Sequence, residues 1–187
     1  MKPNFLVTIS VAALALASCG KKAEPAAENN SANVTNAAAV EAAPVLSAGQ
    51  TFANAAAASD AFEIETSKLA ATSAASAATK AFAQSMIKAH TESTAKLKAA
   101  ASAASPAIVP DPTLTAEQLQ TLEALKGKEG AAFDAAYGEA QANAHQMTLD
   151  ALKSYAASGD VPSLKTFASS LVPIVTAHLN MAKGLKP

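Results

Sequence analysis

The sequence is poor in several residue types, and each shortage narrows what the chain can be. It has no tryptophan and no arginine, and aromatic residues make up only 4% of its 187 residues. All 14 basic residues are therefore lysines, which lack the planar fork that arginine offers to phosphate groups. The formal net charge is −1, and no basic patch interleaved with aromatic residues occurs in the sequence. We therefore expect no nucleic acid among the partners of this protein.

Cysteine occurs only once, at Cys19, so no disulfide can form within the chain. The residue closes the stretch LASC at residues 16–19, which follows a basic start at Lys2 and an apolar run over residues 5–17. This run is shorter than the roughly 20 residues that a membrane-spanning helix needs. A basic start, a short apolar run and small residues before a cleavage site indicate a secretory signal.

The stretch at residues 16–19 also resembles the lipobox of bacterial lipoproteins, a Leu-small-small-Cys sequence. The resemblance implies that residues 1–18 are removed as a signal peptide and that Cys19 is lipidated and becomes the first residue. Several acyl chains on one residue would anchor the protein stably to a membrane. Gly20, rather than aspartate, follows the cysteine, which by resemblance to enterobacterial sorting rules favours the outer membrane, facing the periplasm. The alternative is an ordinary signal peptide with an incidental cysteine.

Residues 19–48 consist mainly of alanine, asparagine, glutamate and proline. Such a segment contains too few large apolar side chains to bury a core, so we expect the lipidated cysteine to be followed by a disordered tether. From about residue 49 the composition changes, and residues 49–187 are long enough to form one domain with a single core.

This domain is predicted to be all-α. Alanine dominates it, and alternating runs of β-branched or aromatic residues are absent from its sequence. Short breaks near residues 75 and 160 predict antiparallel hairpins, whereas the proline-rich stretch after residue 104 predicts a long connection that includes a short helix ending near residue 126. This connectivity is typical of a ferritin-like four-helix bundle. The long helices are expected at about residues 51–73, 76–103, 131–157 and 160–183.

One proline, Pro173, lies in the middle of a predicted long helix. It cannot donate a backbone hydrogen bond to Ser169, so it predicts a kink five residues before His178. The kink would help to aim that side chain. The alternative is a boundary between two shorter helices.

One polar residue lies on the apolar face of each long helix, namely Glu63, His90, His145 and His178. Residues equally distant from the turn of an antiparallel hairpin lie at the same height. Glu63 and His90 are about equally distant from the turn near residue 75, and the other two from the turn near residue 160. If the two hairpins pack side by side, all four side chains can meet at one level of the bundle, where bundle cofactor sites are built.

Four segments resemble the bacterial family called "domain of unknown function 4142", ferritin-like proteins often labelled as outer-membrane proteins. They read FANAAAASDAFEIETSKLA, KAFAQSMIKAHTES, FDAAYGEAQANAHQ and LKTFASSLVPIVTAHLNMA, within about residues 52–185. The chain departs from the family pattern at Ser59 and Asp60, where small residues are usual. The resemblance implies a ferritin-like fold and no particular activity. The family pattern includes the residues matched here by Glu63, His90, Asp134, Tyr137, His145, Pro173 and His178.

Three imidazoles and one carboxylate at one level would suit a transition-metal ion such as Zn²⁺, Cu²⁺, Ni²⁺ or Fe²⁺. A ferritin-type di-iron centre is disfavoured, because it needs Glu-x-x-His on two helices. Here the residues three positions before the histidines are Ile87, Ala142 and Val175.

The leading functional hypothesis is a non-catalytic structural, binding or stress-related module of the cell envelope, with an unidentified protein partner. In this interpretation the four polar residues form a hydrogen-bonded network, with Asp134, Tyr137 and Gln141 as neighbouring partners. A metal-binding bundle is the alternative, and a histidine-based pH sensor is a further one. No nucleophile elbow, P-loop or HExxH motif occurs in the sequence, which argues against an enzyme.

Overall fold

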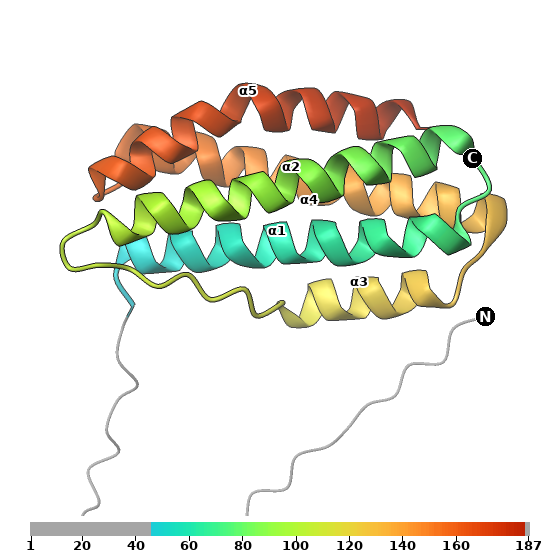
Figure 1. Cartoon of the computed structure of the whole chain (residues 1–187), viewed down its shortest axis with the longest axis horizontal. Coiled ribbons are helices and arrows are strands. Elements are labelled where there is room, and N and C mark those ends of the chain that lie inside the picture. Colours follow the sequence, from blue (N-terminus) through green and yellow to red (C-terminus); the bar gives the residue numbers. More distant parts are fainter. Residues whose placement is uncertain (1–45, 186–187) are drawn as a thin grey trace, which may run out of the picture. The chain divides into compact units, whose positions relative to one another are not determined.

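The computed structural model describes residues 46–185, which form five α-helices and no β-strand (Figure 1). The prediction of an all-α domain is confirmed for this part of the chain. None of the five helices is long and apolar enough to cross a membrane. The predicted signal peptide, Cys19 and the predicted tether up to residue 45 lie outside the described residues. The helices are α1 (Ala48–Ser73), α2 (Ala77–Ser102), α3 (Ala116–Lys126), α4 (Gly130–Ser158) and α5 (Pro162–Gly184).

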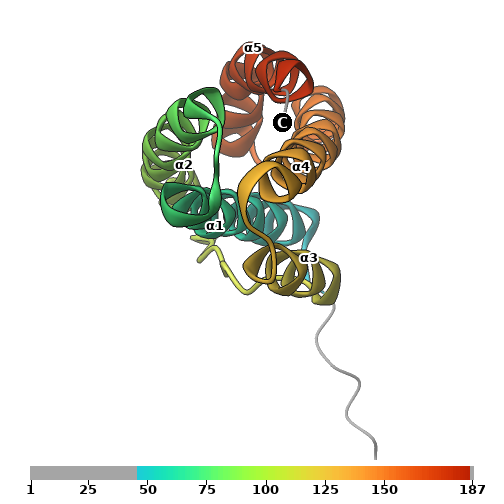
Figure 2. The ribbon, with the colours of Figure 1, turned by 90° about the vertical axis from the view of Figure 1, so that its right-hand side faces the viewer.

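The four long helices pack around a common axis. Helix α1 contacts α2 and α4, and α5 contacts the same two helices on the opposite side, as the end-on view in Figure 2 shows. The short helix α3 lies outside this group against α1 and α4. Turns at residues 74–76 and 159–161 close two hairpins, and the connection over residues 103–129 contains α3. The interior is therefore lined by one face from each of the four long helices.

The start of α3 follows from its sequence. Thr115 accepts a hydrogen bond from the backbone of Gln118 at 3.2 Å, and the Gln118 side chain accepts one from the backbone of Thr115 at 2.9 Å. This reciprocal pair is a capping box, which satisfies two backbone donors at the helix start. The Gln118 amide also donates to the carbonyl of Ala58 at 3.5 Å, so the same residue joins α3 to α1.

Gly159 ends α4, but not in the left-handed conformation that is common for glycine after a helix. Its φ is −59°, and its backbone N–H donates to the carbonyl of Tyr155 at 2.8 Å. A Cβ at this position would lie 2.5 Å from Cε1 of Tyr155, so the tyrosine ring leaves no room for a side chain. That ring stacks on Phe52 with their centroids 3.9 Å apart. The glycine is needed here for close packing rather than for a positive φ.

Helix α5 runs through Pro173 without interruption, so the structure does not contain the two shorter helices of the alternative interpretation. Figure 1 shows α5 bending along its length. His178 lies one turn beyond the proline, in the part of α5 that faces the interior between α2 and α4.

The core of the bundle consists of two apolar clusters with a polar layer between them. One cluster lies toward the start of α1 and includes Phe52, Leu97, Leu152 and Phe167. The other lies toward the end of α1 and includes Ala70, Phe82, Met86, Phe133 and Tyr137. Most of the buried polar residues lie on α1, α2 and α4 between these clusters. They include Asp60, Glu63, Thr66, His90, Gln141 and His145.

Candidate functional site

Three imidazole rings meet in the polar layer, contributed by α2, α4 and α5. The ring centroids of His90, His145 and His178 are 5.5, 5.5 and 5.8 Å apart, so they form a nearly equilateral triangle. The ring planes are inclined to one another by 53–79°, like the blades of a propeller. One ring nitrogen from each histidine lies within 4.8 Å of the other two. The structure thus brings together the three predicted histidines.

The size of this triangle suits three rings bound to one metal ion. With a metal–nitrogen bond of about 2.0–2.1 Å and about 1.1 Å from nitrogen to ring centre, the centroids of three coordinated rings lie about 5.0–5.6 Å apart. Two of the observed separations, at 5.5 Å, lie within this range, and the third, at 5.8 Å, lies slightly above it. Nitrogens on one tetrahedral ion lie about 3.3–3.4 Å apart, so the widest pair would close by at most about 1.5 Å.

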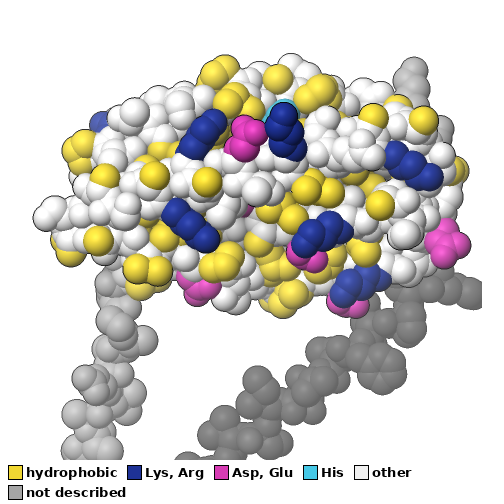
Figure 3. Space-filling view, in the orientation of Figure 1, with side chains coloured by type: hydrophobic (Ala, Val, Ile, Leu, Met, Phe, Trp, Pro, Cys, Tyr) yellow, Lys and Arg dark blue, Asp and Glu magenta, His cyan; other side chains and the backbone are white. Residues whose placement is uncertain are grey.

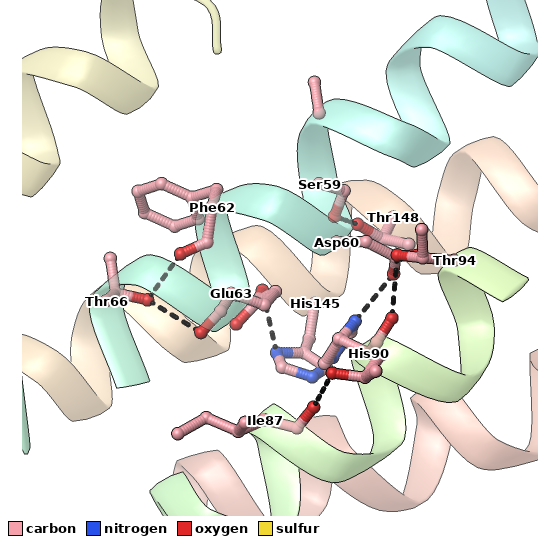
Figure 4. A network of polar contacts seen from close by, with 12 residues as sticks. Ser59, Asp60, Phe62, Glu63, Thr66, Ile87, His90, Thr94, His145 and Thr148 are labelled. Atoms are coloured by element: carbon pink, nitrogen blue, oxygen red, sulfur yellow. Dashed lines mark hydrogen bonds and ion pairs between the residues drawn. The ribbon is translucent and has the colours of Figure 1, made fainter. Parts of the chain in front are cut away.

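Hydrogen bonds hold the outward-facing nitrogen of two of these rings. His90 Nδ1 lies 2.8 Å from Oδ1 of Asp60, whose Oδ2 accepts a hydrogen bond from Thr94 at 3.1 Å (Figure 4). His145 Nδ1 lies 2.8 Å from the backbone carbonyl of Gln141. A carbonyl can only accept, so His145 Nδ1 carries the proton and its Nε2 keeps a free lone pair. Bonds of this kind orient histidine ligands in metal sites.

One nitrogen of each of the three rings is buried and has no partner in the described part of the chain. Within residues 46–185 no group offers a hydrogen bond to His90 Nε2, His145 Nε2 or His178 Nδ1. A buried polar atom without a partner costs about 1–3 kcal/mol. The predicted self-contained network requires every member to be paired, and the described residues leave these three nitrogens unpaired.

Glu63 lies beside the triangle rather than in it. Its Oε1 is 3.4 Å from His145 Nδ1, the nitrogen that faces away from the other rings, and only 1% of the residue is exposed (Figure 4). Burial raises the pKa of Glu63 to about 8, although the positive charge of nearby His90 opposes this shift. In the absence of a further cation, the carboxyl group is therefore mostly protonated at neutral pH.

The pKa shifts of the three histidines differ in direction. Burial lowers the pKa of His145 to about 3 and that of His178 to about 4, with the charge of His90 contributing in both cases. Burial would also lower the pKa of His90, but the hydrogen bond to Asp60 and the charges of Glu63 and Asp60 outweigh it and raise this pKa. Two rings are thus neutral at neutral pH, which is the form that binds metal ions.

The residues predicted to surround the site lie at different distances from it. Gln141 belongs to it through its carbonyl on His145, and its side-chain amide donates to Thr66 Oγ1 at 3.0 Å. Tyr137 lies on the same face of α4 and shares a 2.7 Å hydrogen bond with Ser67.

Asp134 belongs to another part of the molecule. Its Oδ2 accepts a hydrogen bond from the backbone N–H of Ser76 at 2.8 Å, at the turn between α1 and α2. It therefore ties α4 to that turn and does not reach the histidines.

A pocket of about 70 Å³ opens beside the cluster between α2 and α5. Its lining includes His90, His178 and Asp60, together with Glu92 and Lys96 on α2. A space of this size accommodates several water molecules. The triangle is therefore accessible from one side of the bundle.

Sequence reasoning missed Asp60, which is 5% exposed and bonded to His90. The signal was present, because Asp60 lies three residues before Glu63 and hence on the same face of α1. It is also one of the two positions where the chain departs from the family pattern. Thr94, one turn after His90 on α2, was missed as well.

The fold and the cluster can now be compared with known proteins. The family model described as "Domain of unknown function (DUF4142)" matches residues 33–185. The chain belongs to this family. No curated protein and no solved structure matches it. The family description assigns no activity, so the function has to be argued from the site.

Proposed function

We propose that this DUF4142 protein is a metal-binding helical bundle in which His90, His145 and His178 hold one divalent transition-metal ion. The observation that carries the proposal is the arrangement of the ring nitrogens. One nitrogen of each ring is buried and lacks a partner within the described residues. Nδ1 of His90 and Nδ1 of His145, in contrast, are held by hydrogen bonds. A bound ion would satisfy all three unpaired nitrogens at once.

A metal ion also fits the charges around the triangle. The carboxyl groups of Asp60 and Glu63 lie behind His90 and His145, where they would balance part of the charge of the ion. A hydrogen-bonded network without an ion leaves Glu63 and three imidazole nitrogens without good partners in this part of the chain. The metal interpretation is therefore preferred over the network that the sequence alone favoured.

The donor set narrows the class of ion. Three imidazole nitrogens suit Zn²⁺, Cu²⁺, Ni²⁺ or Fe²⁺ and are poor ligands for Mg²⁺ or Ca²⁺, which prefer oxygen. Ferritin-type di-iron chemistry needs carboxylates that bridge two ions. Here both nearby carboxylates lie behind histidine rings. Binding or buffering of a single ion is the function that these donors support.

We further propose that the domain is a ferritin-like bundle anchored to the cell envelope through lipidated Cys19, with the outer membrane as its site and the periplasm as its surroundings. The support is the LASC stretch at residues 16–19 and the hairpin, long connection and hairpin order of the helices. A tethered bundle of this kind would bind metal ions close to the membrane surface.

Metal binding is tested with protein purified without a histidine tag. We expect one ion per chain on addition of Zn²⁺, Cu²⁺, Ni²⁺ or Fe²⁺, and a rise of about 5–10 °C in Tm when the free ion is at about a hundred times Kd. His178→Ala should abolish both effects. This residue is the most exposed of the three histidines, so its loss disturbs the core least. Metal content by mass spectrometry and Tm by calorimetry measure the result.

Asn180→Ala is the matched control, because Asn180 is exposed on the same helix. It should bind one ion as the parent protein does. Absence of a stoichiometric ion from the parent protein, or equal binding by the His178→Ala variant, would contradict the proposal.

Lipid anchoring is tested separately by Cys19→Ala. We expect the parent protein to fractionate with membranes and to incorporate labelled fatty acid, because several acyl chains give stable anchoring. The variant should lose the label. An unlabelled parent protein would rule out lipidation and leave the metal proposal unaffected.

A further inference from the structure

The protein supplies three imidazoles to the cluster, and α1 supplies none. Among the histidine, cysteine, aspartate and glutamate side chains of residues 46–185, only the three histidines form a group of three whose ligand atoms all lie within 4.8 Å of one another. Zn²⁺ and related ions take at least four ligands, and a site with three protein ligands keeps a position for a water or a substrate. The fourth ligand therefore has to come from Glu63 or from outside the described residues.

Glu63 is poorly placed for this role. Its Oε1 lies 3.4 Å from His145 Nδ1, which donates to Gln141 and is turned away from the other rings. To reach the centre of the triangle, the carboxylate would have to pass around the His145 ring in a layer where both residues are 1% exposed. Close packing on every side opposes such a movement.

The pocket between α2 and α5 provides the other route. Two of the three histidines, His90 and His178, line this pocket. Figure 3 shows histidine surface (cyan) next to lysine and acidic side chains on this face of the molecule. Its volume of about 70 Å³ limits an occupant to a few water molecules or one small ligand of similar size. Its walls are largely apolar and include Leu171, Ile174 and Val175.

We propose that the bound ion keeps one coordination position facing this pocket and takes a small exogenous anion there. This inference rests on the proposed function. Three neutral imidazoles leave the double positive charge of the ion uncompensated among its direct ligands, so an anion is favoured over a neutral molecule. Lys96 in the pocket wall attracts a negative ligand, whereas Glu92 and Asp60 in the same lining oppose it, so the charge of the ion decides the preference for an anion. Binding is a ligand exchange in which the anion displaces water from the ion, and no electron is transferred.

The probe is sodium azide, a linear anion of three atoms, added to the purified protein loaded with one equivalent of Cu²⁺. We expect a saturable azide-to-copper charge-transfer band. Ala89→Leu should weaken azide binding by about tenfold or more, because a larger side chain fills the pocket wall next to His90. Ala81→Leu is its matched control, since Ala81 is exposed on α2 and does not line the pocket.

A second pair of variants changes the charge of an exposed side chain and leaves the buried residues unchanged. Lys96→Glu should weaken azide binding severalfold at low ionic strength, and the effect should shrink as salt is added. Lys98→Glu is the control, because Lys98 is exposed on α2 and does not line the pocket. This pair decides the question even if Ala89→Leu impairs folding.

The outcomes separate the two proposals. Stoichiometric copper with no azide band would overturn this inference and leave the proposed function standing. If an azide band then appears in the copper-loaded Glu63→Gln variant, Glu63 occupies the fourth coordination position of the ion in the parent protein. Equal azide binding by all four pocket and control variants would show that the anion does not enter through this pocket. Absence of bound copper from the parent protein would overturn both proposals.

Discussion

Asp60 and Glu63 lie one turn apart on α1, yet they serve the cluster differently. Asp60 hydrogen-bonds His90 Nδ1 at 2.8 Å and is itself held by Thr94. Glu63 makes only a 3.4 Å approach to His145, whose Nδ1 is already bonded to a backbone carbonyl. Asp60 therefore fixes the direction of one ring, whereas Glu63 mainly supplies a charge that depends on its surroundings.

Asp60→Asn is expected to lower metal affinity by about 10–100-fold, because an amide orients the His90 ring less firmly and lacks the compensating charge. Competition with a chelator of known affinity measures the change. Glu65→Gln is the matched control, since Glu65 is exposed on α1 and pairs with the exposed Lys68. Unchanged affinity in Asp60→Asn would show that this carboxylate does not position His90.

At the scale of the helices, local contacts define where each helix begins and ends, and only some of these contacts can be predicted from the sequence. The capping box at Thr115 and Gln118 is visible in the sequence and present in the structure. Ser76 precedes α2 at the N-cap position, but its side chain makes no capping bond, and its backbone N–H is satisfied by Asp134 from another helix. Gly159 is required because the Tyr155 ring lies against it.

Gly159→Ala should lower the free energy of unfolding by about 1–3 kcal/mol, because the new Cβ would overlap the Tyr155 ring and carbonyl. Gly184→Ala is its control, since nothing lies within 4 Å of a Cβ there and Gly184 is exposed. Urea unfolding followed by circular dichroism gives both values. Equal stability of the two variants would mean that the turn after α4 adjusts without cost.

The whole domain is stabilised by two apolar clusters and interrupted by a buried polar layer. Without a cation the layer reduces stability, because buried ionisable groups must either shift their pKa or remain unpaired. The folded state keeps the Glu63 proton up to a pH of about 8, whereas an ordinary glutamate releases it at 4.5. His145 and His178 behave oppositely, since their pKa values fall from 6.5 to about 3 and 4.

The metal-free protein should therefore be most stable at about pH 6–7. Below pH 6.5 the unfolded chain binds more protons at His145 and His178, so the free energy of unfolding falls as the solution becomes more acidic. Above pH 6.5 the folded state holds extra protons at Glu63 and, with its raised pKa, at His90. Stability then falls again, with a slope of about 1.4 kcal/mol per pH unit for each proton.

Urea unfolding in the presence of a chelator, from pH 4.5 to 9, gives this profile. Glu63→Gln should flatten the alkaline side by about one proton, because the amide does not titrate. A free energy of unfolding that keeps rising from pH 6.5 to 8 in the parent protein would contradict the raised pKa that burial gives Glu63.

The sequence by itself determined the all-α class, the helix ranges to within a few residues and the inward direction of the three histidines. These features depend on local propensity, helical periodicity and equal distance from a turn, all of which are read along one chain. Only the tertiary structure decided which polar groups became partners. Asp60 on α1 bonds His90 on α2, and Asp134 on α4 bonds the turn between α1 and α2. Glu63 lies next to the His145 ring and not among the three rings. Such choices depend on how helices rotate and pack against one another, which periodicity within each helix does not specify.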